Sequence, residues 1–413
     1  MAAYNLSLGL ISSDFKQEPP DFWDIKDRFE HTYIVGKTGM GKSSLLEHMA
    51  YYDISHGLPL IFIDPKGESC QKLYNLTKDK SKILYISIES PTVINPLHKD
   101  GYKLDNLIQE FIQILDVLIT LTASNPESTV LMREIINRAM HSITREQDKN
   151  LDYLTKFLLY SEVRKNLKNT LSAESELRKY WDEFDGVKGK IPRNAQKVEC
   201  AQRLASRLLE ISSGEMKDFV VGKNELDISN VVNSKKVVLV DTSRMNRNSR
   251  IYLTNLIVYS ILSYCEFAKE KNHPLMVYVD EFQIVVSDLF AELLARSRSS
   301  KIGFTLAHQN FLQIPRNILG AIFGNVGTSI CFRCGDEEAK RFAPFFNTKA
   351  QDLFNLPKYT AWARIGTNNT LFETYPPKKV ELSHIIWVKK KTTKEPELEF
   401  ADVNFLGDQW VNL

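Results

Sequence analysis

Eight consecutive residues, numbers 36–43, have the types and spacing needed to hold the phosphates of a nucleotide. They fit the pattern G-x-x-x-x-G-K-[ST], in which glycines let backbone N–H groups converge on an anion. The Lys42 ammonium would reach the β- and γ-phosphates, and the Ser43 hydroxyl would take a place on Mg²⁺. A glycine-rich turn without a ligand is the alternative. The residues that we expect to bind the nucleotide are Gly36, Lys37, Thr38, Gly39, Met40, Gly41, Lys42, Ser43 and Ser44.

Two adjacent acids, Asp280 and Glu281, follow an apolar run at residues 275–279. At the end of a buried strand, Asp280 would hold Mg²⁺ through its water shell and Glu281 would polarise the attacking water. Neighbouring strand residues face opposite sides, so the chain must turn beyond the strand for both acids to reach one cleft. An exposed Asp-Glu pair in a loop is the alternative.

Four further side chains are candidates for the same chemistry. Gln309 follows a strand-like run, and its amide can donate to a phosphate while accepting from water; otherwise it is an ordinary surface residue. Arg298 and Arg333 are candidate arginine fingers, cations that complete the site of a neighbouring subunit. Asp64 ends another apolar run, and the Pro-Lys-Gly after it indicates either a β-turn or part of a ligand-binding edge.

A parallel β-sheet is the element that would bring these residues together. Apolar, β-branched runs predict strands buried on both faces, and the carboxyl ends of such strands form the ligand-binding edge of open α/β sheets. We also expect a helix over residues 44–50 and a hairpin from residue 359 onward. The predicted strands span residues 32–35, 58–63, 83–88, 235–241, 275–279, 303–307 and 328–332.

The middle of the chain has a different pattern, with apolar residues recurring every three or four positions. We therefore predict an all-α insertion. Its locally basic stretch, residues 188–193 followed by Lys197, Arg203 and Arg207, favours a solvated helix face over a DNA contact. The predicted divisions are an N-terminal arm (1–25), a nucleotide-binding domain in two parts (26–104 and 216–380), the α-insertion (105–215) and a tail (381–413).

Composition limits the class of protein. The 413 residues are 43% hydrophobic and 25% charged, as in soluble globular proteins, and the net charge of +2 gives no global basic field for nucleic acid. Five scattered cysteines suit a reducing cytoplasm. Cys331 and Cys334 form a C-x-x-C in a strand-like run, where we expect them to face opposite sides rather than share a metal. We see no signal peptide and no apolar run of the roughly 18–20 residues that a membrane span needs.

Taken together, these motifs resemble the HerA/FtsK superfamily of DNA-pumping ATPases, and most of all the conjugative coupling proteins of type IV secretion systems. The resemblance covers about residues 26–375 and implies a RecA-like P-loop NTPase core, an α/β fold with a mostly parallel sheet and an inserted all-α domain. It also implies a hexameric ring with ATP between subunits and nucleic acid in a central channel. Coupling proteins usually begin with transmembrane helices, which we do not find here. The motifs that carry the resemblance are residues 28–31, 34–39, 62–68, 95–97, 278–283, 306–309 and 328–339.

Three functional hypotheses follow. The first is an ATP-driven DNA translocase or coupling ATPase that uses Mg²⁺ and works as a homo-oligomeric ring. The second keeps the ATPase but moves secreted protein or pilin subunits. The third is a nucleotide-gated adaptor that recruits a relaxase or nuclease without turnover, which Glu281 disfavours because a pure switch has less need of a water-polarising acid. In each case we expect a cytoplasmic protein, either a soluble relative of the coupling proteins or one that a partner attaches to a membrane.

Overall fold

The computed structural model describes residues 5–6, 8–11, 23–97, 104–122, 129–143, 150–186, 195–267, 273–286 and 288–375. Most of the predicted N-terminal arm, the basic stretch at 188–193 and the tail at 381–413 lie outside these residues. Within the described ranges, no helix is long and apolar enough to cross a membrane.

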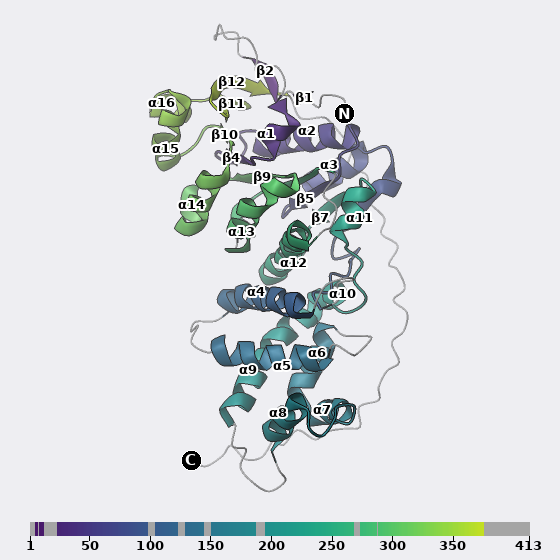
Figure 1. Ribbon diagram of the computed structural model, residues 1–413. Coiled ribbons are helices and arrows are strands. Elements are labelled where there is room, and N and C mark those ends of the chain that lie inside the picture. The colour runs from purple at the N-terminus through teal and green to yellow at the C-terminus, as the bar shows by residue number, and fades with distance from the viewer. Residues whose placement is uncertain are drawn as a thin grey trace.

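A mixed sheet runs through the upper part of the molecule in Figure 1, and seven neighbouring strands at its centre and one end are parallel. These seven correspond one to one to the predicted strands, so the predicted α/β class is confirmed. Three antiparallel strands extend the sheet, and two of them form the hairpin predicted from residue 359. In spatial order the ten described strands are β2 (Gly9–Ile11), β12 (Asn368–Thr374), β11 (Thr360–Ile365), β10 (Thr328–Cys331), β4 (Thr32–Val35), β9 (Ile302–His308), β8 (Leu275–Val279), β5 (Leu60–Asp64), β7 (Val237–Asp241) and β6 (Ile83–Ile86).

Helices cover both faces of this sheet because alternate strand residues point to opposite sides. On one face, Ile34 and Phe62 pack with α2 (Lys42–Ser55) and α3 (Glu68–Leu76). On the other, Tyr33 and Ile61 belong to the core shared with larger helices. The helices on that second face are α12 (Arg247–Phe267), α13 (Asp288–Ser297), α14 (Arg316–Asn325) and α15 (Asp336–Phe346).

The described residues between 104 and 212 form helices joined by turns and contain no strand, as the sequence pattern predicts. In Figure 1 these helices lie beyond α12, which separates them from the sheet and contacts α4. One hydrophobic core runs from the sheet through α12 into this region, and its largest fully buried side chain is Trp181. The domain boundaries given above stay a prediction. The helices are α4 (Leu104–Thr122), α5 (Thr129–Ile143), α6 (Leu151–Leu159), α7 (Ser161–Lys168), α8 (Glu176–Asp185) and α9 (Ala195–Ser212).

The remaining elements are short. A two-stranded sheet joins β1 (Asn5–Leu6) to β3 (Trp23–Asp24), within the predicted N-terminal arm, for which no strand was predicted. A strand of two residues is too short to show an apolar pattern in the sequence. The short helices are α1 (Ile25–Arg28), α10 (Lys217–Val220), α11 (Ile228–Asn233) and α16 (Ala350–Phe354).

The two cysteines of the C-x-x-C lie together, contrary to the prediction that they face opposite sides. Strand β10 ends at Cys331, so Cys334 lies beyond it, and the chain turns to bring the two sulfur atoms to 3.5 Å. Both thiols are fully buried. Strand periodicity was the wrong basis for placing Cys334.

Candidate nucleotide-binding and hydrolysis site

The glycine loop joins the end of β4 to the start of α2, as its flanking residues predict. Gly41 has a φ of 118°, a left-handed conformation that side chains rarely adopt, and it immediately precedes the first helical residue, Lys42. A Cβ added at Gly41 would lie 2.8 Å from Tyr359 Cδ1. The tip of the loop, residues 37–39, is exposed. The first turn of α2 can therefore present its N–H groups to an anion approaching from solvent.

Lys42 is folded back onto the loop itself. Its Nζ donates to the carbonyl oxygens of Gly36 and Lys37 at 2.7 and 3.1 Å, and the residue is only 5% exposed. Burial lowers the pKa of Lys42, although the nearby carboxylates of Glu281 and Asp280 oppose that shift. A cation held so close to the backbone N–H groups suits phosphate oxygens, which could replace the two carbonyls.

Ser43 and Asp280 form the pair predicted to hold a metal ion. The Ser43 hydroxyl donates to Asp280 Oδ2 at 2.7 Å, which joins the first turn of α2 to the end of β8. Burial raises the pKa of Asp280, and the hydrogen bond from Ser43 opposes the shift. A hydroxyl and a carboxylate at this spacing are oxygen donors of the kind that Mg²⁺ accepts, so the donor set fits the ion.

Glu281 points into the same cleft because the chain turns sharply after β8. Its φ is 48°, which is left-handed, so the turn that both acids require is present. The carboxylate forms an ion pair with Lys66 and accepts from Gln283 Nε2 at 2.6 Å. Burial would raise the pKa of Glu281, but the hydrogen bonds from Lys66 and Gln283 together lower it below its usual value.

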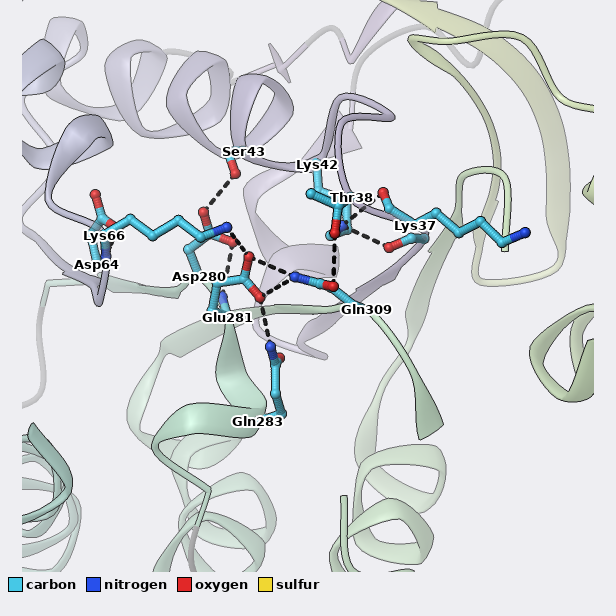
Figure 2. A network of polar contacts seen from close by, with 11 residues as sticks. Lys37, Thr38, Lys42, Ser43, Asp64, Lys66, Asp280, Glu281, Gln283 and Gln309 are labelled. Carbon is cyan, nitrogen blue, oxygen red and sulfur yellow. Dashed lines mark hydrogen bonds and ion pairs between the residues drawn. The ribbon is translucent and has the colours of Figure 1, made fainter. Parts of the chain in front are cut away.

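Gln309 bridges the acids and the glycine loop, at the position predicted from its place after β9. Its Nε2 donates to both carboxylate oxygens of Glu281, at 2.9 and 2.8 Å, and its Oε1 accepts from Thr38 Oγ1 at 2.8 Å. Figure 2 shows the resulting chain of contacts, which runs from the loop through Gln309 and Glu281 to Lys66. A movement of Thr38 in the loop would therefore shift the Gln309 amide, which contacts Glu281 directly.

The two candidate arginine fingers occupy different places. Arg298 precedes β9, at the opposite edge of the sheet from the glycine loop, and forms an exposed ion pair with Glu30. Arg333 lies beside the loop: its carbonyl accepts from the Lys37 N–H at 2.7 Å, and its Nε donates to Leu356 O at 2.6 Å. Both arginines are thus bonded within their own chain, and the side chain of Arg298 is exposed.

Sequence reasoning missed two participants and left the role of a third open. Lys66 and Gln283 both bind Glu281, yet neither was assigned a role. Asp64, for which a β-turn and the ligand-binding edge were both left open, ends β5 and accepts from the N–H groups of Lys66 and Ser69, each at 2.8 Å. Burial, reinforced by the charge of Asp280, raises the pKa of Asp64 to about 6. The Asp-Pro-Lys-Gly motif after a buried strand was the available signal for Lys66.

Comparison with protein families gives one match. The family described as "Helicase HerA, central domain" matches residues 24–261 of this chain. That range includes the glycine loop, the Asp-Pro-Lys-Gly turn and the described helices between β6 and β7. A search of curated proteins finds no match.

Solved structures of similar fold include a plasmid coupling protein, TrwB, and the protein VirB4. The plasmid coupling protein TrwB in complex with ADP and Mg²⁺ has a TM-score of 0.67 and 14% identity, over 94% of this chain and 98% of that one. TrwB with the ATP analogue ADPNP gives the same TM-score, at 13% identity and with 94% and 97% covered. VirB4 of Thermoanaerobacter pseudethanolicus has a TM-score of 0.62 and 13% identity, over 91% and 98%. Identities this low establish the fold alone.

Proposed function

Since the chain belongs to the family of the helicase HerA central domain, we propose that it is an ATP-driven motor that moves or delivers DNA. The observation that carries the proposal is the convergence, at one edge of the sheet, of the glycine loop, the Ser43–Asp280 pair and the Gln309–Glu281 pair. Binding alone would need only the loop. An acid placed beside a side chain that also contacts the loop supports hydrolysis.

The roles proposed for the residues follow from their contacts. Lys42 and the loop N–H groups would hold the phosphates, and Ser43 with Asp280 would hold Mg²⁺, whose charge would offset that of the phosphates. Glu281 accepts a proton from the attacking water as the water oxygen bonds to the γ-phosphorus, and the bond to the β-phosphate oxygen breaks. The products are ADP and phosphate.

A ring of identical subunits fits the site because its loop tip is open to solvent. We propose that ATP lies between neighbouring subunits of a homohexamer and that Arg298 of one subunit completes the site of the next. The position of Arg298 at the opposite edge of the sheet, with 66% of its side chain exposed, supports that choice over Arg333. Release of Arg298 from Glu30 would accompany assembly. DNA would occupy the centre of the ring.

The test is the ATPase rate of the assembled protein with increasing single- or double-stranded DNA, together with its mass in solution. We expect DNA to stimulate the wild type. Lys42→Ala should lose ATP binding, whereas Glu281→Gln should bind ATP and lose at least about a hundredfold in rate, the usual contribution of a general base. An ATPase rate that no form of DNA changes would contradict the proposal.

A motor that moves protein subunits is the second candidate. The net charge of +2 favours it, because a DNA motor gains from a basic field that this chain lacks overall. ATP hydrolysis stimulated by envelope proteins of a secretion system, and unaffected by DNA, would support this candidate and exclude the first. A relaxase or nuclease that bound without any phosphate release would instead indicate the adaptor.

A further inference from the structure

The Asp-Pro-Lys-Gly turn, residues 64–67, has no role in the function proposed above. It follows β5, and its lysine reaches across the site to form an ion pair with Glu281. The Lys66 side chain is 50% exposed, whereas that of Glu281 is 4% exposed. The Lys66 ammonium is thus held at a buried acid, whereas a surface lysine commonly keeps its ammonium in water.

Hydrogen bonds and close packing hold the backbone of Lys66 in place. Asp64 Oδ1 accepts from the Lys66 N–H and Oδ2 accepts from the Ser69 N–H, both at 2.8 Å. Gly67 has a φ of 80°, and a Cβ there would lie 2.6 Å from Asp241 Oδ1. The ends of two neighbouring strands, β5 and β7, thus hold the turn, and only glycine fits between them.

The Glu281 carboxylate is saturated with donors in this state. Oε1 contacts Lys66 and Gln309, while Oε2 contacts Gln283 and Gln309. A carboxylate offers about four lone-pair positions, so these contacts leave none for a water molecule. At least one donor must move away before Glu281 can accept a proton.

Gln309 is the donor best placed to move. Its amide is tied at the other end to Thr38, which lies in the exposed tip of the loop that would surround the phosphates. An amide N–H between a carboxylate and an arriving γ-phosphate can donate to either anion. Lys66, in contrast, extends from a turn that the sheet holds in place.

We propose that Lys66 is a positioning residue for ATP hydrolysis, which keeps one oxygen of Glu281 in place while the Gln309 amide moves to the γ-phosphate. The lone pair released by Gln309 then accepts the proton of the attacking water. This inference rests on the proposed function, because it requires hydrolysis at this site. It assigns to Lys66 an effect on turnover rather than on nucleotide affinity.

The test compares ATP hydrolysis by the wild type, Lys66→Met and Lys66→Arg in the full chain. We expect Lys66→Met to lower kcat about tenfold, part of the factor that a general base contributes. The KM for ATP should stay within about threefold, because the loop and Lys42 still hold the phosphates. Lys66→Arg keeps a cation at the turn and should recover most of the rate. ATP binding and thermal unfolding of each variant would be measured in parallel.

A matched control removes another lysine–glutamate pair from the same part of the fold. Lys72 of α3 lies 3.0 Å from Glu47 of α2, outside the contacts of Glu281. Lys72→Met should therefore leave kcat and KM unchanged. A fall in kcat in this control equal to that of Lys66→Met would attribute the effect to general loss of charge and overturn the inference.

Other results overturn it just as clearly. Wild-type kcat in Lys66→Met, a raised kcat, or a raised KM at constant kcat would each exclude positioning of Glu281, the last because it marks phosphate binding. Failure of Lys66→Arg to restore any rate would do the same. If the wild type binds ATP and never hydrolyses it, the proposed function falls together with this inference; in the other cases the proposed function stands.

Discussion

A buried ion pair beneath the site gives a prediction whose magnitude follows from the structure. Arg28 donates to both carboxylate oxygens of Asp53, at 2.6 and 2.7 Å, and to Tyr278 Oη at 2.6 Å. Arg28 is 4% exposed, and the other two are fully buried. Asp53 belongs to α2 and Tyr278 to β8, so the network fastens the helix after the glycine loop to the strand before Asp280.

Arg28→Met should destabilise the protein by about 3–5 kcal/mol, because it leaves the Asp53 carboxylate buried without a cation. That loss is a fifth or more of the roughly 5–15 kcal/mol that stabilises a typical domain. The double variant Arg28→Met/Asp53→Leu removes both charges and should recover most of the loss, since apolar side chains can replace a buried pair at little cost.

Urea unfolding followed by circular dichroism measures both changes, with an unchanged m-value showing that the same unit unfolds. The exposed pair of Arg298 and Glu30, at 66% and 38% exposure, provides the control: Arg298→Met should cost less than about 1 kcal/mol. A loss below about 1 kcal/mol in Arg28→Met, or a double variant as unstable as the sum of its two single variants, would refute this reasoning.

Two further predictions concern pH and the loop. Burial, followed by the charge of Arg298, lowers the pKa of His31 to about 4, against the hydrogen bond to Leu294. The folded-state pKa lies below the unfolded value of about 6.5. The free energy of unfolding is therefore largest above pH 6.5 and falls as the pH drops toward about 4. Urea unfolding should show a loss of stability on the order of 2 kcal/mol between pH 7.5 and 5.0. The loss should be smaller in His31→Asn, because the short asparagine side chain tolerates the left-handed φ at this position. An equal loss in the variant would show that other groups titrate. Gly41→Ala should weaken ATP binding at least about tenfold in equilibrium dialysis, because strain from the left-handed backbone adds to a clash with Tyr359. Gly39→Ala should lose less affinity, because no atom lies within 4 Å of a Cβ at that position. Equal losses of affinity in the two variants would exclude the clash.

Much of the core was predictable because its signals are local. Seven buried strands appear as short apolar runs, and residues placed just after them, such as Asp280 and Gln309, must meet at one edge of a parallel sheet. A turn beyond the strand was expected for two adjacent acids that share one site, and the structure makes it with the left-handed backbone of Glu281. Both the apolar runs and the residues that follow them can be read from neighbouring positions in the sequence.

What could not be predicted depends on contacts between distant parts of the chain. Lys66 and Glu281 are far apart in sequence, and nothing about a lysine in a turn indicates which acid it will reach. Cys334 was misplaced because the end of β10, and not strand periodicity, decides its direction. Helix α7 has few buried apolar residues and holds its place through the buried Arg164, which pairs with Asp185.

The proposed motor couples ATP hydrolysis at this site to movement along DNA. The most direct measurement is displacement of streptavidin from the biotinylated end of single- and double-stranded DNA by the assembled protein. We predict displacement that requires ATP, on at least one form of DNA, and none with Glu281→Gln, which keeps the loop and loses the proton acceptor. Steady ATP hydrolysis by the wild type without displacement from either form would contradict the claim.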